Sequence, residues 1–328
     1  MKNGVLLLNL GGPETLADVR PFLYRLFSDP AIIRIKNPVF RRLLAWTISR
    51  TREKKSQNLY RQIGGGSPLR RITESQAAAL EAALAERGTP ARVYVGMLCG
   101  RPSIDEAFSG IIADGVGRLT LLPLFPQYSG TTTGACFHHI ESLLRRRKLS
   151  EKIKIFHIED WYKNTLYIES VTDMITAGLE RFPEEERKDV HILYSAHSLP
   201  ERYVKEGDPY HDRTRECVLL INDRLKKRFD FVADYSLAFQ SKIGPVKWLK
   251  PSVEEVLRIL ALRGIRNILA VPVSFVSDHI ETLYELDIEY VKLASGLGIT
   301  EFKRAESLNV HPKFIAALAD VAMDVSDG

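Results

Sequence analysis

The sequence of 328 residues is poor in cysteine and has no long apolar run, and each lack excludes a class of protein. Its three cysteines, Cys99, Cys136 and Cys217, form no CxxC pair and are odd in number. This argues against a disulfide framework and a structural zinc site, and it fits a reducing compartment, the cytoplasm. No stretch approaches the roughly 18 uninterrupted apolar residues of a transmembrane helix, so none is expected.

An excess of charge of one sign is also lacking. The chain has 46 Lys and Arg against 41 Asp and Glu, and a net charge of +5 does not predict a nucleic-acid partner. With 45% apolar and 27% charged residues, the composition is that of a globular protein and excludes disorder. The opening segment MKNGVLLLNLGG has too brief an apolar run for a signal peptide, and we interpret it as a first buried strand.

Short apolar runs rich in β-branched residues alternate with longer helical patterns along the whole chain. Such alternation is typical of βαβ units, whose parallel sheets are covered by helices on both faces. The predicted strands are Val5–Leu8, Val93–Met97, Leu119–Phe125, Ile153–His157, Val190–Tyr194, Tyr235–Phe239 and Ile268–Ser274. The sequence therefore predicts an α/β fold with parallel sheets flanked by helices.

The chain also repeats itself. RPSIDEAF (101–108) matches KPSVEEVL (250–257), and GVGRLTLLPLF (115–125) matches GIRNILAVPVS (264–274). Both matches have the same offset, with no gap between the two blocks, which indicates an internal duplication.

The duplication predicts an N-terminal lobe over residues 1–155 and a C-terminal lobe over residues 156–304. A last helix, at about residues 305–328, is expected to pack back on the first lobe. In open α/β sheets, ligands bind beyond the carboxyl ends of the strands, so we expect the active site in the cleft between the lobes. The segments at those strand ends are 9–10, 125–133, 195–198, 240–248 and 275–281.

One segment, VSDHIETLYELDIEY (276–290), carries a row of acids. With α-helical spacing, Asp278, Glu281, Glu285 and Glu289 fall within an arc of about 80°. Acids one turn apart repel each other, so the row costs stability unless cations lie nearby. It is either a solvated face with basic partners or a path for a metal cation.

His197, in LYSAHSLP, immediately follows a predicted strand. It is either a structural hydrogen-bonding residue or a metal ligand or base. No GxSxG motif surrounds the neighbouring serines, so a serine hydrolase is not indicated. Imidazole with a carboxylate, here Glu281, suits a borderline divalent ion such as Fe²⁺, Co²⁺ or Zn²⁺. Two ligands alone hold a metal weakly, which suits a metal that is passed on.

Three other stretches have a structural and a functional interpretation. IGGGSP (63–68) lacks the P-loop lysine and is interpreted as a tight turn, whereas SGTTTG (129–134) either binds an anion or caps a helix. The basic stretch 38–55, with Phe40 and Trp46, predicts either a membrane-surface helix or a core-facing one.

Taken in order, the motifs resemble those of the ferrochelatase family over nearly the whole chain. They are LNLGGPET (8–15), YRQIGGGSP (60–68), LFPQYSGTTTG (124–134), SAHSLPERY (195–203), QSKIGPVKWL (240–249), SDHIETLYELDIEY (277–290) and RAESLN (304–309). The resemblance implies a fold of two Rossmann-like lobes, as in chelatases. It also implies a lyase that inserts Fe²⁺ into a porphyrin in haem synthesis. No redox cofactor is then required, and Fe²⁺ is a substrate.

The resemblance also implies roles for individual residues. His197 and Glu281 are the expected catalytic pair, and with Glu285 and Glu289 they form the expected metal path. The residues expected to bind porphyrin are Asn9, Leu10, Ser67, Phe125, Ser129, Thr131, Trp248, Phe275 and His279. Possible contact with a membrane is assigned to residues 38–55, which makes the expected protein cytoplasmic and loosely membrane-associated.

This chain departs from the family pattern at a few positions. Leu98 and Cys99 replace an Arg-Tyr pair of many relatives, which puts a porphyrin contact there in doubt. Gly130 stands where animal members have a cluster cysteine, so no iron–sulfur cluster is expected. Leu10, where coproporphyrin-using relatives carry tyrosine, favours protoporphyrin IX. The alternatives are a cobalt or other tetrapyrrole chelatase and a non-catalytic haem- or metal-binding protein.

Overall fold

The protein divides into two compact units, seen here in a computed structural model. The structure describes residues 2–149, 151–230, 233–242, 244 and 246–324. One unit consists of Met1–Trp161 with Ile315–Gly328, and the other of Tyr162–Phe314. The predicted last helix begins at Pro312 rather than near residue 305, and its last residues, 325–328, lie outside the described part.

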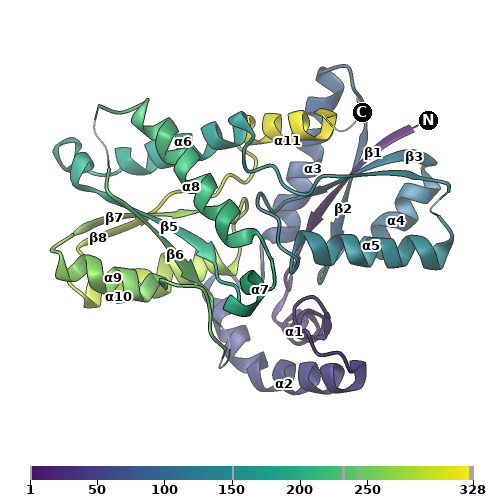
Figure 1. Ribbon diagram of the computed structural model, residues 1–328, viewed down its shortest axis with the longest axis horizontal. Coiled ribbons are helices and arrows are strands. Elements are labelled where there is room, and N and C mark those ends of the chain that lie inside the picture. Colours follow the sequence, from purple (N-terminus) through teal and green to yellow (C-terminus); the bar gives the residue numbers. More distant parts are fainter. Residues whose placement is uncertain (1, 150, 231–232, 243, 245, 325–328) are drawn as a thin grey trace. The chain divides into compact units, whose positions relative to one another are not determined.

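The first unit is built on a parallel sheet in the order β2-β1-β3-β4. Figure 1 labels three of these strands, β1, β2 and β3. Its strands are β1 (Lys2–Asn9), β2 (Arg92–Met97), β3 (Val116–Pro123) and β4 (Lys154–His157). Leu6, Leu7 and Leu8 of the inner strand β1 have no exposed surface, because both faces of the sheet are covered. The helical elements are η1 (Leu16–Asp18), α1 (Val19–Ser28), α2 (Pro38–Gln62), α3 (Leu69–Glu86), α4 (Ile104–Ala113), α5 (Thr133–Arg147) and most of α11 (Pro312–Asp324).

The second unit repeats this plan with a parallel sheet in the order β6-β5-β7-β8. Its strands are β5 (His191–His197), β6 (Tyr235–Gln240), β7 (Asn267–Pro272) and β8 (Glu301–Arg304). Its helical elements are α6 (Thr165–Glu180), η2 (Glu184–Asp189), α7 (Glu201–Lys205), α8 (Tyr210–Lys226), α9 (Val253–Leu262), the π-helix η3 (Glu281–Tyr290) and α10 (Val291–Gly296). The predicted alternation of strands and helices is confirmed, and β8 is an eighth strand that the sequence patterns did not reveal.

The predicted duplication is confirmed down to the helix caps. Ser103 caps α4 by accepting a hydrogen bond from the backbone of Glu106 at 3.2 Å, and both residues form a capping box. Ser252 and Glu255 do the same for α9 at 3.3 Å, at the offset that the sequence repeats predicted. Each box satisfies backbone donors at a helix start, so both copies keep the same strand-to-helix connection.

The glycine stretch 63–68 is the predicted tight turn, here between α2 and α3. Gly64 and Gly65 have φ angles of +100° and +93°, which side chains rarely adopt. A Cβ atom on Gly66 would lie 2.0 Å from the carbonyl oxygen of Glu14. The glycines are therefore explained by backbone geometry.

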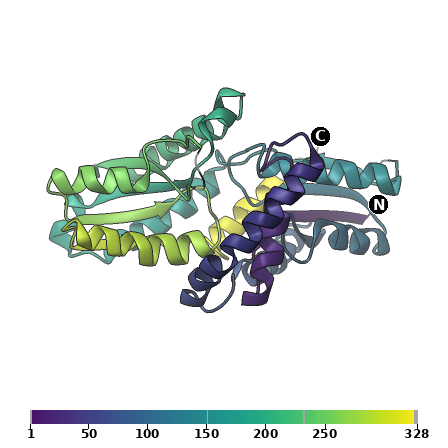
Figure 2. The ribbon, with the colours of Figure 1, turned by 90° about the horizontal axis from the view of Figure 1, so that it is seen from below.

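Helix α2 turns its small residues inward and its large apolar residues outward. Ala45 and Ser49 are buried, whereas Phe40 and Leu43 are 66% and 59% exposed. The helix runs beside α1, and most of its length is visible in Figure 2. Of the two interpretations of stretch 38–55, the core-facing one is wrong for its large apolar side chains. No helix in the described ranges is long and apolar enough to cross a membrane.

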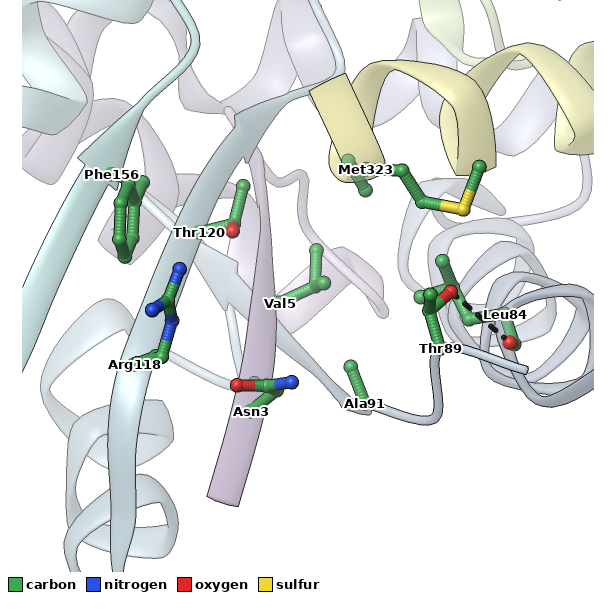
Figure 3. Close-up of a pocket in the computed structure, with 11 residues that line it drawn as sticks. Asn3, Val5, Leu84, Thr89, Ala91, Arg118, Thr120, Phe156 and Met323 are labelled. Carbon is green, nitrogen blue, oxygen red and sulfur yellow. Dashed lines mark hydrogen bonds between the residues drawn. The ribbon is translucent and has the colours of Figure 1, made fainter. Parts of the chain in front are cut away.

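A small hollow lies near the start of the strands of the first sheet (Figure 3). Asn3 of β1, Arg118 of β3 and Phe156 of β4 line it. In open α/β sheets, ligands bind beyond the carboxyl ends of strands, so the functional site is expected at those ends and not at this hollow.

Candidate active site

His197 is the last residue of β5, and hydrogen bonds fix its backbone on both sides. Its N–H donates to Oγ of Ser274 at 2.9 Å, and the hydroxyl of Tyr210 donates to its carbonyl oxygen at 2.9 Å. Its ring nitrogen Nδ1 lies 2.9 Å from Oε2 of Glu281. The two residues that the sequence singled out as a pair are thus in direct contact.

Glu281 begins a π-helix, which differs from the α-helix assumed for this segment. A π-helix is closed by hydrogen bonds between residues five apart, so its turns are wider than those of an α-helix. Thr282, Leu286 and Tyr290 are buried on one side of η3. Glu281, Glu285 and Glu289 each precede one of them, so these three acids form a row along the same helix.

Asp278 does not belong to this row, so the predicted row of four acids is wrong in that respect. It precedes η3 and accepts hydrogen bonds from Ser307 and Asn309 at 2.8 and 2.9 Å. It also lies 3.1 Å from the guanidinium of Arg304. These contacts supply the donors and the positive charge that a largely buried acid requires. The carboxylate of Asp278 is therefore paired with Arg304, Ser307 and Asn309 and does not extend the row.

Glu285, one turn beyond Glu281, is held by the end of strand β6. Nε2 of Gln240 donates to Oε2 of Glu285 at 2.9 Å and to the carbonyl oxygen of Glu281 at 3.0 Å. The hydroxyl of Ser241 donates to the same carboxylate oxygen at 2.6 Å. Gln240 is fully buried, and Ser195 donates a hydrogen bond to its Oε1. A polar network thus links β5 and β6 to the row of acids.

Two aromatic rings complete the surroundings of the pair. Phe275 lies edge-on to His197, with 6.3 Å between ring centroids, and 4.5 Å from the ring of His279. Nδ1 of His279 lies 3.0 Å from the carbonyl oxygen of Ser277, and its Nε2 lies 3.8 Å from Oε2 of Glu281. A single carboxylate oxygen therefore lies between two imidazoles.

The site separates the pKa values of its two inner carboxyl groups. Burial opposes the ionisation of Glu281, but the charges and hydrogen bonds of His197 and His279 dominate and hold its pKa well below the ordinary range. Burial and the nearby charge of Glu281 raise the pKa of Glu285 to about 8. The site therefore favours the ionised form of Glu281 and the protonated form of Glu285.

His197 is tuned by the same contact. Burial alone would lower its pKa, but the charge and hydrogen bond of Glu281 outweigh burial and raise the pKa above the ordinary value. With Nδ1 directed to Glu281, the other ring nitrogen, Nε2, has no hydrogen-bond partner within the described part of the chain. Nε2 is therefore free to accept a proton or bind a metal ion, and Glu281 stabilises the positive charge that results.

The remaining predicted residues of the second unit lie further along the same segments. Glu289 is exposed near the end of η3. Trp248 is half-buried in the loop after β6, where its backbone pairs with that of Pro200. The structure therefore brings together five of the predicted residues, namely His197, Phe275, His279, Glu281 and Glu285.

Six predicted residues belong to the first unit. They lie at or after the ends of strands β1 and β3, or within the glycine turn. Asn9 is buried and donates a hydrogen bond from Nδ2 to Thr73 at 3.1 Å, and Leu10 follows it half-buried. Ser67 lies in the turn against Gly12. Phe125 packs against the hydrophobic core, and Ser129 and Thr131 share a hydrogen bond of 2.9 Å. Stretch 129–134 leads directly into α5, which begins at Thr133.

Sequence reasoning missed Gln240, Ser241 and Tyr210. Gln240 and Ser241 fall within a predicted strand-end segment and begin the motif QSKIGPVKWL, but neither signal assigned a role to their side chains. Tyr210 begins α8, away from every predicted strand end, and its hydroxyl reaches His197 only through the fold.

This chain is similar to known proteins over nearly its whole length. A family model described as ferrochelatase matches residues 2–325. The chain is 46% identical over 326 residues to the ferrochelatase of Prochlorococcus marinus, covering 99% of this chain and 83% of that protein. It is 48% identical over 322 residues to the ferrochelatase of Gloeothece citriformis, covering 98% and 82%.

A solved structure supports the fold as well. The sirohydrochlorin chelatase SirB from Bacillus subtilis subspecies spizizenii, in complex with cobalt, superposes with a TM-score of 0.55 over 100% of this chain and 96% of that one. At 13% identity, this likeness concerns the fold alone. It confirms the predicted chelatase-like α/β fold.

Proposed function

The chain belongs to the ferrochelatase family, and we propose that its His197–Glu281 pair is the centre at which it inserts ferrous iron into protoporphyrin for haem synthesis. The observation that carries this proposal is the contact of 2.9 Å between Nδ1 of His197 and Glu281. The family match favours iron over the cobalt and non-catalytic alternatives. As an enzyme of this type, it is a lyase.

The pair meets the chemical demand of insertion. Two pyrrole protons leave the porphyrin as a dication enters, so the reaction needs a base beside a negatively charged path. Nε2 of His197 takes the two pyrrole protons one after the other and passes each to the row of acids, and the ionised Glu281 stabilises the imidazolium that forms each time. Glu285, with a pKa of about 8, exchanges protons near neutral pH, and Glu289 extends the row to solvent. His197 and the row of acids also hold Fe²⁺ weakly before it enters the ring.

We assign porphyrin contact to Asn9, Leu10, Ser67, Phe125, Ser129 and Thr131 of the first unit, and to Trp248, Phe275 and His279 of the second. The apolar Leu10 favours protoporphyrin IX, whose ring edge is less polar than that of coproporphyrin.

We propose that the enzyme requires no resident cofactor. The chain has three cysteines, one fewer than the four thiolates of a common iron–sulfur cluster. All three are buried and free, which fits packing in a reducing cytoplasm.

The direct test is anaerobic insertion of Fe²⁺ into protoporphyrin IX, followed by the change in porphyrin absorbance. We expect turnover with protoporphyrin IX and slower turnover with coproporphyrin. Binding of protoporphyrin without insertion, followed by failure with coproporphyrin and with Co²⁺, would contradict an enzymatic function.

Helix α2 supports a further part of the proposal, namely peripheral contact with an anionic membrane surface. Val39, Phe40 and Leu43 are more than half exposed. The guanidinium carbon of Arg50 lies over the ring of Trp46, 5.5 Å from the ring centroid. Arg42, which lies between Phe40 and Leu43 in the sequence, is exposed as well. Apolar and aromatic side chains beside cations are typical of helices that bind the interface of anionic lipids.

Replacing Phe40 and Leu43 together by aspartate is expected to weaken binding to vesicles containing phosphatidylglycerol by tenfold or more. Each change removes an apolar side chain whose insertion contributes about 1.5–3 kcal/mol and adds a charge that the lipid repels. Co-sedimentation with vesicles measures the effect. Leu262→Asp is the matched control, because this leucine is 89% exposed on α9. Equal binding by the double variant and the control would exclude α2 as the contact.

A further inference from the structure

Arg304, the last residue of β8, reaches back to the π-helix with a two-pronged ion pair. Its Nε lies 2.8 Å from Oδ1 of Asp287, and its Nη2 lies 2.9 Å from Oδ2. The arginine side chain is only 10% exposed. A guanidinium that matches both oxygens of a carboxylate fixes direction as well as distance.

The third nitrogen of the same guanidinium contacts Asp278, near the start of the acidic segment 276–290. Nη1 lies 3.1 Å from Oδ1 of Asp278, which also accepts a hydrogen bond from Thr282 at 3.1 Å. Burial opposes the ionisation of Asp278, but Arg304 and the neighbouring donors outweigh it and lower its pKa. One buried cation thus contacts residues on both sides of Glu281 and Glu285.

These contacts divide the acids of the segment into two sets. Asp278 and Asp287 bind the guanidinium of Arg304. Glu281 and Glu285 contact histidine, glutamine and serine side chains instead. An acid that binds Arg304 is neutralised, so Glu281, Glu285 and the exposed Glu289 are the acids of this segment that stay available for protons and metal.

We propose that Arg304 is a positioning residue for the insertion reaction, which clamps Asp278 and Asp287 so that the π-helix presents Glu281 to His197. The inference rests on the proposed function of the His197–Glu281 pair. Arg304 itself takes no part in metal or proton transfer, and it acts through the backbone that carries Glu281 and Glu285.

The test compares Arg304→Gln, Arg304→Lys and Asp287→Asn with the parent. Loss of a group that orients a metal site typically lowers activity by about 10–100-fold. We expect Arg304→Gln to lower kcat by at least about tenfold, with KM for protoporphyrin within about twofold. Arg304→Lys keeps the positive charge but loses the paired nitrogens that contact both oxygens of Asp287, so its kcat should lie between those of Arg304→Gln and the parent. Asp287→Asn, which leaves Arg304 paired with Asp278, should lower kcat by less than Arg304→Gln.

Arg263→Gln is the matched control, since Arg263 forms an exposed ion pair with Asp234 in the same unit. It should keep kcat within about twofold. A folded Arg304→Gln protein whose kcat equals that of this control would overturn the proposal. An equal loss in Arg304→Lys and Arg304→Gln with normal activity in Asp287→Asn would overturn it as well.

Hydrogen exchange separates this inference from the proposed function. Arg304→Gln should speed amide exchange over residues 278–290 by at least about tenfold and leave strands β5 and β6 unchanged. This measurement needs no turnover, so it tests the clamp even if the parent inserts no iron. Unchanged exchange over residues 278–290 would overturn the clamp even if the parent is an active chelatase.

Discussion

His197→Ala is expected to lower kcat for Fe²⁺ insertion by about three orders of magnitude, while protoporphyrin still binds. A positioned general base contributes about 10²–10⁴-fold to a rate. The change also affects Glu281, whose low pKa depends on the charge of its neighbours. Without His197, burial favours the protonated carboxyl group, so the site loses its base and part of its negative charge together.

Stopped-flow absorbance under anaerobic conditions measures the loss, and quenching of tryptophan fluorescence measures porphyrin binding separately. His157→Ala is the matched control, because His157 ends strand β4 as His197 ends β5. Its ring packs against Phe137 rather than a carboxylate, and the variant should keep the parent's kcat within about twofold. A folded His197→Ala protein that retains a tenth of the parent's kcat would refute the role of His197.

The fold was predictable because its parallel strands are buried on both faces. Runs such as Leu6–Leu8 and Ile268–Val271 must be apolar throughout, and turn residues mark their ends. His197 was predictable for a related reason, since polar residues directly after such strands reach the ligand side of the sheet. Strand β8 was missed because its sequence, EFKR, is short and mostly polar at the edge of the sheet.

The π-helix was not predictable from its own residues. Segment 281–290 has no glycine or proline to mark a change of helix type, and its apolar residues fit an α-helical face nearly as well. The wider turn is accompanied by contacts from outside, namely Gln240 on the carbonyl oxygen of Glu281 and Arg304 on Asp287. Both contacts come from strands distant in sequence, so a local pattern could not reveal which acids face His197.

Glu281→Gln is expected to lower kcat by about a hundredfold and to move the acid limb of the pH–rate profile to lower pH. The amide keeps the size of the side chain and an acceptor for the N–H of His197, but it removes the charge. In the parent, burial lowers the pKa of His197 and Glu281 more than compensates. Without that charge, burial prevails, so the pKa falls below its usual value of about 6.5 and the imidazole becomes a weaker base.

Stability should change with pH in a direction that the same shifts determine. The pKa of His197 is higher in the folded state than its value of about 6.5 in the unfolded state. This difference stabilises the folded state fully below pH 6.5, and the stabilisation is lost as the pH rises through the pKa of the folded state. The lowered pKa of Glu281 stabilises it above the unfolded value of about 4.5, and this is lost as pH falls. Urea unfolding should therefore show the largest difference between parent and Glu281→Gln from about pH 4.5 to 6.5.

Glu289→Gln separates the effect of the pair from the general effect of removing an acid, because Glu289 is exposed on the same π-helix. It should leave the acid limb and the pH dependence of unfolding as in the parent. If Glu281→Gln also leaves the acid limb unchanged, His197 is not the group that titrates there. If instead the limb moves to higher pH, the charge of Glu281 does not stabilise the imidazolium. Only a shift to lower pH with a lower plateau fits a base whose strength depends on one buried carboxylate.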